Sequence, residues 1–188
     1  MPRDNLQADI PTTARQWFPA TALTLQQHSP LLAWLQNPGS LTAALQHHSR
    51  GEFAVTVLAQ YWGRADFSEA KALNINPRAE VLIREVILSG RGQPWVWARS
   101  ILPRSSLTGS LRKLSKLDNQ PLGGWLFKQP NLKRDPLQIS RFAPNDSRLT
   151  ASITRDQDLW GRRSVFYVNQ KPILVAEVFL PEFLATLT

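Results

Sequence analysis

Two apolar segments of this chain each carry one charge at a position where a buried side chain is expected. In the segment 171–181, Lys-Pro-Ile-Leu-Val-Ala-Glu-Val-Phe-Leu-Pro, the alternation of a β-strand puts Glu177 on the apolar face. In the segment 81–88, Val-Leu-Ile-Arg-Glu-Val-Ile-Leu, alternation puts Arg84 on the apolar face. A lone charge on such a face is costly unless it is paired or meets a ligand. We therefore predict that the two strands place one cation and one anion in a closed, mostly apolar pocket.

Two interpretations of Arg84 and Glu177 are open at this point. In the first, Arg84 holds a carboxylate of a ligand in a forked geometry, while Glu177 accepts a proton or a hydrogen bond from a hydroxyl at the far end of the ligand. In the second, the two side chains form an ion pair with each other in the core. Spacing along the sequence does not decide between them, because both interpretations satisfy the buried charges.

The pattern of apolar segments predicts an α+β fold in a single domain. The chain has 188 residues, of which 43% are hydrophobic, and this is enough for one sizeable core. Residues 1–29 are polar and contain three prolines, so we expect an N-terminal arm before a domain at 30–188. The segments of strand character predict about six strands in an antiparallel sheet, mostly linked as hairpins. They are 53–62, 80–88, 93–102, 137–142, 159–168 and 171–181.

Two short helices are expected to form a lid. Pro30–Leu35 begins with proline, which suits a first helical turn, and Ser40 is a suitable N-cap for Leu41–Gln46. The Asn-Pro-Gly between them makes a helix-turn-helix unit. A further helix is expected to begin at Pro121, which leaves the backbone N–H groups of Leu122–Gly124 free to bind a carboxylate. A plain helix start after a loop explains the same pattern.

The segments 80–88 and 93–102 flank a tight turn, Ser-Gly-Arg-Gly, and are expected to pair as a hairpin. Strict alternation along the second segment puts Trp95, Trp97 and Arg99 on one face. Aromatic side chains at this spacing are typical of a core.

Residue content excludes several kinds of chemistry. The chain has no cysteine, so it has no disulfide, thiolate nucleophile or cysteine metal site. Its histidines are His28, His47 and His48. Adjacent histidines on a helix diverge by about 100° and cannot both face one ion, so we expect a solvated helix end and no metal site. Phosphate-binding loops, serine elbows and zinc-protease motifs are also absent from the sequence.

Composition also bears on location and partners. The N-terminus lacks the apolar core of a secretory signal, and no apolar segment approaches the ~20 residues needed to cross a bilayer. We therefore expect a cytoplasmic protein without stable membrane insertion. The formal net charge is +8, but the basic residues are scattered along the chain. We expect no nucleic-acid partner, because this charge explains the attraction of a small dianion equally well.

Several segments, taken together, resemble the chorismate lyase (chorismate pyruvate-lyase) family. Leu-Trp-Gly-Arg-Arg-Ser at 159–164, followed by Lys-Pro-x-Leu-x-x-Glu at 171–177, is the most specific of them. The match runs from about Leu31 to Pro181, in order and with similar spacing. The resemblance implies a six-stranded antiparallel sheet with helical flaps covering an occluded internal ligand site. The other matching segments are 82–88, 92–95 with 98–99, and 121–123 with 126–127.

The resemblance also implies an activity. Members of that family convert chorismate to 4-hydroxybenzoate and pyruvate, the first committed step towards ubiquinone in proteobacteria. Aromatisation drives the step, so no metal, nucleotide or other cofactor is required. We expect a monomer whose partners are chorismate as substrate and 4-hydroxybenzoate as product. Because the product keeps the groups that Arg84 and Glu177 contact, tight product retention is expected.

The resemblance assigns roles to individual residues. Arg84 corresponds to the arginine that holds the aromatic carboxylate, and Glu177 corresponds to the glutamate at the ring hydroxyl. Leu122 contributes its backbone amide, and Leu41 takes the place of a methionine whose backbone contacts the ligand. The sequence departs from the family in the segment 143–154 and in the N-terminal arm, which are both longer. Neither departure removes a site residue.

An alternative from another class is a non-catalytic sensor of aromatic carboxylates, because ligand-binding domains of some bacterial transcription regulators look similar to this fold. Those domains normally follow a winged-helix DNA-binding domain. We expect no such segment before this chain, which favours the enzyme. A nucleic-acid binder depends on the net charge alone and ranks last.

Overall fold

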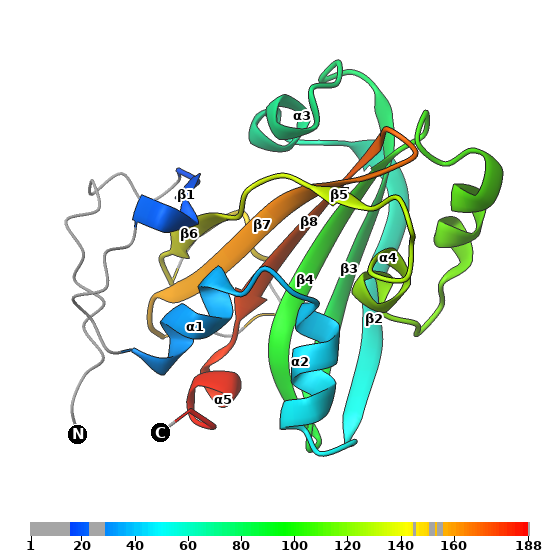
Figure 1. Cartoon of the computed structure of the whole chain (residues 1–188). Coiled ribbons are helices and arrows are strands. Elements are labelled where there is room, and N and C mark those ends of the chain that lie inside the picture. Colours follow the sequence, from blue (N-terminus) through cyan, green and yellow to red (C-terminus); the bar gives the residue numbers. More distant parts are fainter. Residues whose placement is uncertain (1–15, 23–28, 145, 151–152, 154–155, 188) are drawn as a thin grey trace.

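An antiparallel sheet runs through the molecule, with helices on both of its faces (Figure 1). The computed structural model describes residues 16–22, 29–144, 146–150, 153 and 156–187. None of the described helices has both the length and the apolar character that crossing a membrane requires. The strands are β1 (Phe18–Pro19), β2 (Phe53–Arg64), β3 (Glu80–Gly90), β4 (Gln93–Pro103), β5 (Lys133–Arg134), β6 (Gln138–Phe142), β7 (Leu159–Val168) and β8 (Lys171–Phe179). The helices are α1 (Pro30–Gln36), α2 (Leu41–His48), α3 (Phe67–Leu73), α4 (Leu122–Leu126) and α5 (Pro181–Leu184), with the 3-10 helices η1 (Ala20–Ala22) and η2 (Gly109–Lys116).

The six longer strands match the predicted segments, but the predicted number of strands is wrong. Within the described residues the sheet has eight strands, in the order β1-β6-β7-β8-β4-β3-β2, with β5 pairing with β7 off this path. The two additional strands, β1 and β5, have two residues each, which is too short for alternation to show in the sequence. β1 belongs to residues 1–29, and its Phe18 pairs with Ile139 of β6. The boundary between an arm and a domain stays a prediction.

Alternation along the strands separates two faces of the sheet. On the face that we call the front, Arg84 lies opposite Ser100, and Glu177 lies opposite both Ala98 and Arg162. Buried leucines of α1 and α2 pack on one part of this face, and leucines of η2 and α4 pack on another. The predicted apolar face with buried charges is therefore present and is covered by helices. That these helices act as flaps stays a prediction.

The other face, which we call the back, carries α3 and described residues of the connection between β6 and β7. Leu73 of α3 belongs to one apolar cluster on the back face, and Leu149 and Ile153 of the connection belong to a second one with Trp97. The sheet is therefore covered on both sides, so a charged side chain on either face needs a partner.

A β-bulge in β4 changes the predicted direction of one tryptophan. The register with β3 shifts between Leu88 and Ser89, so Trp95 has no partner on β3. Trp95 packs in a front cluster with the leucines of α1 and α2, whereas Trp97 lies in a back cluster. The prediction that the two tryptophans share a face is wrong, because it assumed unbroken alternation.

The two histidines at the end of α2 have different environments. His47 is exposed, as predicted for a solvated helix end, but His48 is half-buried and packs edge-on against the rings of Trp34 and Phe183. Its Nε2 lies 2.8 Å from Thr186 Oγ1. Burial is the main cause that lowers the pKa of His48 from its ordinary value of 6.5. The prediction of a solvated helix end is therefore wrong for His48.

We expect His48→Gln to flatten the dependence of stability on pH. Because the pKa of His48 is lower in the folded state, the unfolded chain takes up a proton first as the pH falls, and wild-type stability decreases below about pH 6.5. Glutamine cannot titrate, so the variant should lose less free energy of unfolding between about pH 7.5 and 5.5, measured by urea titration. His47→Gln should keep the wild-type slope, and equal slopes in all three proteins would contradict this expectation.

Candidate functional site

Four charged side chains from four strands gather on the front face, beneath the covering helices. Arg84 comes from β3, Arg134 from β5, Arg162 from β7 and Glu177 from β8. Of these four, the sequence predicted Arg84 and Glu177 as site residues, beside the backbone contacts of Leu41 and Leu122. Their hydrogen-bond partners decide which interpretation of the buried charges is correct.

Arg84 is almost fully buried and donates only to uncharged acceptors. Its Nη1 donates to Gln60 Oε1 at 3.1 Å. Its Nη2 donates to the carbonyl oxygens of Asp118 at 2.7 Å and Gln120 at 3.1 Å. Burial lowers the pKa of Arg84, and the Asp118 carboxylate opposes this shift. Arg84 thus holds the segment between η2 and α4, which leads directly to Leu122.

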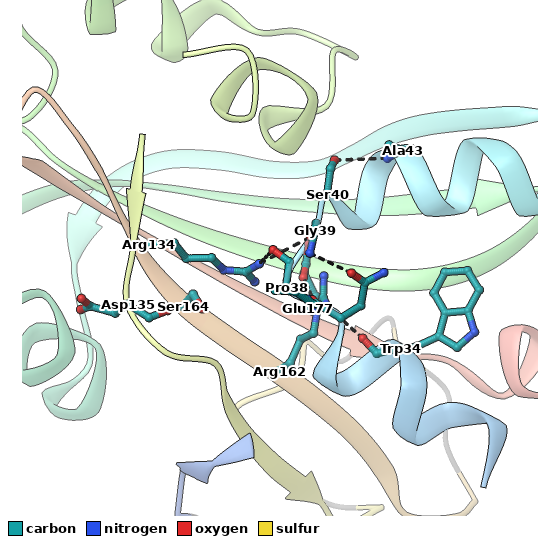
Figure 2. Close-up of polar contacts among 11 residues, drawn as sticks. Trp34, Pro38, Gly39, Ser40, Ala43, Arg134, Asp135, Arg162, Ser164 and Glu177 are labelled. Carbon is teal, nitrogen blue, oxygen red and sulfur yellow. Dashed lines mark hydrogen bonds and ion pairs between the residues drawn. The ribbon is translucent and has the colours of Figure 1, made fainter. Parts of the chain in front are cut away.

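Glu177 forms an ion pair with its neighbour on β7. Arg162 Nε donates to Glu177 Oε2 at 2.8 Å, and Arg162 is 1% exposed. Arg162 Nη1 donates to the carbonyl oxygens of Trp34 and Asn37, each at 2.8 Å (Figure 2). The interpretation in which Arg84 and Glu177 pair with each other is therefore wrong.

Arg134 extends from β5 toward the turn between α1 and α2 (Figure 2). Its Nη1 donates to the carbonyl oxygen of Pro38 at 2.7 Å, and its guanidinium carbon lies 4.8 Å from the ring centre of Phe166. Its Nε is buried and has no hydrogen-bond partner among the described residues. Burial, followed by repulsion from Arg162, lowers the pKa of Arg134 to about 10, while Glu177 opposes the shift. The side chain is therefore a cation near the Arg162–Glu177 pair.

Sequence reasoning missed both Arg162 and Arg134 as site residues. Arg162 had a signal, because alternation puts it on an apolar face of the segment 159–168, much as it puts Arg84 on an apolar face of 81–88. Arg134 had no such signal, because β5 has two residues and shows no alternation.

The two predicted backbone contacts, Leu41 and Leu122, lie at the starts of α2 and α4. Both side chains are buried. The starts of the two helices pack closely, since a Cβ added to Gly123 would lie 2.8 Å from Thr42 Oγ1. Pro121 is the N-cap of α4 and not its first residue, and no side chain caps this helix. The N–H of Leu122 therefore lies in a first helical turn, where intrahelical acceptors are lacking.

The front-face group carries more positive than negative charge. Among the described residues, Arg162 pairs with Glu177, but neither Arg84 nor Arg134 forms an ion pair with a carboxylate. Two cations are thus uncompensated beneath the helices, and such a group suits a ligand with two negative charges. Within the described segments, no three His, Cys, Asp or Glu side chains form a group that could hold a metal ion.

A cavity of about 470 Å³ opens on the back face, and its charges are balanced differently. Its lining includes three arginines but also three carboxylates. Arg99 pairs with Glu69 at 2.7 Å and with Glu85 at 2.6 Å. Arg99 on the back face therefore meets carboxylates of the protein itself, whereas Arg163, which also lines this cavity, donates to Gln138 Oε1 and Ser68 Oγ and forms no ion pair among the described residues.

The sequence matches the family model described as Chorismate lyase over residues 12–186. It is 40% identical over 169 residues to a protein of Pseudomonas putida named Probable chorismate pyruvate-lyase, and the aligned region covers 88% of both chains. A protein of Pseudomonas entomophila named Probable chorismate pyruvate-lyase 2 is 38% identical over 181 residues, which cover 96% of this chain and 94% of that protein. The likeness thus extends over most of each chain.

Two solved structures have a similar fold at low sequence identity. The effector domain of PhnF from Mycobacterium smegmatis has a TM-score of 0.56 and 19% identity, over 77% of this chain and 90% of that chain. A transcriptional regulator of the GntR family from Bacillus cereus has a TM-score of 0.52 and 15% identity, over 70% of this chain and 93% of that chain. At these identities the likeness concerns the fold alone.

We expect Arg162→Met to destabilise the protein by about 3–5 kcal/mol, because it leaves the largely buried Glu177 carboxylate without its cation and leaves two backbone carbonyls without their donor. Arg141→Met is the matched control. Arg141 pairs with Asp158 at the exposed surface, so its loss should cost less than about 1 kcal/mol. Urea titration measures the free energy of unfolding of both variants. Equal costs would mean that the buried pair contributes no more than a surface pair.

Proposed function

The chain belongs to the chorismate lyase family, and we propose that it removes pyruvate from chorismate to give 4-hydroxybenzoate without a cofactor. The observation that carries this proposal is the match to the family over residues 12–186. The protein is accordingly a lyase. The uncompensated cations of the front face support a dianionic substrate such as chorismate.

The proposed reaction requires few catalytic groups from the protein. Chorismate carries one carboxylate on its ring and another on an enolpyruvyl ether. The bond between C3 and the ether oxygen breaks, C4 loses its proton, and the ring becomes aromatic. The proton ends on the methylene carbon of the enolpyruvyl group, which leaves as pyruvate with a new carbonyl. Atoms and charge balance without another reactant, so the protein has to bind, orient and exclude water.

Arg84 anchors the ring carboxylate in this proposal. Three of its N–H groups donate to protein acceptors, and a guanidinium has five, so two are left for a ligand. A charge-assisted hydrogen bond to a carboxylate is stronger than a neutral one. Leu122, which follows the segment that Arg84 holds, adds its backbone amide, and Leu41 does the same from the start of α2.

Glu177 orients the hydroxyl at C4 of the ring. Arg162 occupies its Oε2, and no described residue donates to its Oε1. Oε1 is therefore the acceptor that we assign to the substrate hydroxyl. The enolpyruvyl methylene can take the C4 proton directly, so Glu177 acts by positioning and need not act as a base.

The covering helices have to open to admit chorismate, so we propose that the α1–α2 pair and α4 act as flaps. 4-Hydroxybenzoate keeps the ring carboxylate and the hydroxyl, so we expect the product to be retained tightly. We further propose that the protein works as a monomer in the cytoplasm and supplies 4-hydroxybenzoate to ubiquinone biosynthesis.

A second candidate is a sensor that binds an aromatic carboxylate without turnover. The observation that favours it is the likeness in fold to the effector domain of PhnF. The two candidates differ in one measurement, because a sensor binds 4-hydroxybenzoate but leaves chorismate unchanged.

Wild-type protein should convert chorismate to 4-hydroxybenzoate, followed by ultraviolet absorbance and chromatography of the product. Arg84→Ala should weaken the binding of 4-hydroxybenzoate by about 1.5–3 kcal/mol, because a charge-assisted interaction is lost. Arg78→Ala removes an exposed arginine, controls for net charge, and should bind as wild type does. A wild type without turnover argues against the lyase, and wild-type affinity in Arg84→Ala argues against this site.

Glu177→Gln should slow turnover by less than ~100-fold, because general acid–base catalysis contributes about 10²–10⁴-fold and positioning contributes less. The single oxygen of the amide stays with Arg162 Nε, and the amide NH2 can donate to the oxygen of the substrate hydroxyl, so the hydroxyl keeps a hydrogen-bond partner. Values of kcat for chorismate and of Kd for 4-hydroxybenzoate are measured on the same preparations. A much larger loss of kcat with unchanged Kd would instead assign proton transfer to Glu177.

A further inference from the structure

We propose that Arg134 binds the carboxylate of the enolpyruvyl group, the part of chorismate that leaves as pyruvate. Arg134 is then a substrate-binding residue, and this role rests on the proposed function. It explains why two front-face cations, Arg84 and Arg134, have no carboxylate partner among the described residues. Chorismate brings two carboxylates, one for each cation.

The free edge of the Arg134 guanidinium has the geometry that a carboxylate requires. Nη1 donates to the carbonyl oxygen of Pro38, but Nε is buried without a partner, and Nη2 donates to no described residue. The Nε–H and one N–H of Nη2 point in the same direction along one edge of the planar group. A carboxylate accepts both hydrogen bonds at once, so this edge is suited to a forked contact.

The edge of the Arg134 guanidinium that carries Nε is unfavourable without a hydrogen-bond acceptor. A buried N–H of a charged group that lacks an acceptor has lost its water without replacement. Burial and repulsion by Arg162 also lower the pKa of Arg134 to about 10. A bound carboxylate supplies both the missing acceptors and the missing negative charge.

The position of Arg134 fits the enolpyruvyl carboxylate and not the ring carboxylate. In chorismate the ring carboxylate and the hydroxyl lie at opposite ends of the ring, and the ether is next to the hydroxyl. With the ring carboxylate at Arg84 and the hydroxyl at Glu177, the ether lies at the Glu177 end. The charge of Arg134 interacts with those of Glu177 and Arg162. Arg134 and Arg162 also hold the same turn between α1 and α2 (Figure 2).

The same guanidinium joins the substrate to a covering segment. Nη1 holds the carbonyl of Pro38 in the turn, and in this proposal the free edge holds the substrate, so Arg134 links a bound enolpyruvyl carboxylate to this turn. 4-Hydroxybenzoate has no such carboxylate. Arg134 therefore distinguishes chorismate from its aromatic product, whereas Arg84 contacts both.

Two ligands separate this role from a purely structural one. 4-Hydroxybenzoate has one carboxylate, and 3-(carboxymethoxy)-4-hydroxybenzoate carries a second one on an ether oxygen next to the hydroxyl. Calorimetry gives the Kd of both ligands for wild type, Arg134→Met and Arg134→Lys. Lys133→Met removes an exposed charge from the same strand and is the control. The kcat/KM for chorismate is measured on the same four proteins.

We expect Arg134→Met to weaken the dicarboxylate roughly 10- to 150-fold, as for the loss of a charge-assisted pair, and to weaken 4-hydroxybenzoate less than about threefold. The kcat/KM for chorismate should fall by a factor similar to that for the dicarboxylate. Arg134→Lys keeps the charge but loses the fork, so its losses should be intermediate. Lys133→Met should match wild type in every measurement.

Equal losses for both ligands in Arg134→Met would overturn the proposal and leave Arg134 with the structural role of holding Pro38. Unchanged affinity for both ligands would overturn it as well. A wild type without chorismate turnover would overturn the proposed function, yet the comparison of the two ligands would still decide what Arg134 binds. If Arg134→Met does not fold, the same comparison in Arg134→Lys decides.

Discussion

Buried arginines that donate to backbone carbonyls hold the covering segments onto the front face of the sheet. Arg84 binds carbonyls between η2 and α4, whereas Arg162 and Arg134 bind carbonyls of α1 and of the turn before α2. A carbonyl oxygen satisfies an N–H group but carries no full negative charge. The contacts that close the front face therefore leave positive charge within it, and of the three arginines only Arg162 has a carboxylate partner among the described residues, Glu177.

This arrangement makes the ligand part of the charge balance. Burial lowers the pKa of both Arg84 and Arg134, so each cation is less stable in the folded protein than in water. A ligand with two negative charges offsets the cost of burying both arginines, whereas a ligand with one negative charge offsets it at only one of them. On the back face, by contrast, Arg99 meets carboxylates of the protein itself. The cavity on the back face holds three carboxylates beside its three arginines, although one of these, Arg163, forms no ion pair among the described residues. This balance of charge, and not the size of a cavity, is why we place the site on the front face.

Structural features that follow from alternation over many residues of a strand could be predicted from the sequence. Features that depend on how two strands pair, or on a single residue, could not. Alternation over long strands placed Arg84 and Glu177 on apolar faces, because many residues share that signal. The partner of Glu177 depends on the register between β7 and β8, to which hydrogen bonds along both strands contribute. One bulge redirected Trp95, and the two-residue β5 carries Arg134. In both cases too few residues carry the information for a pattern to form.

If Arg84 and Arg134 divide the two carboxylates of chorismate, the reaction itself separates the ligands of the two arginines. Before cleavage both carboxylates belong to one molecule, so binding at Arg84 brings the second carboxylate to Arg134 at a high effective concentration. After the bond between C3 and the ether oxygen breaks, pyruvate loses that advantage, while 4-hydroxybenzoate keeps its contacts with Arg84 and Glu177. Pyruvate is then the weaker ligand and leaves first, past the turn that Arg134 holds at Pro38. The tight retention that we propose for the aromatic product would then follow from this division of charge.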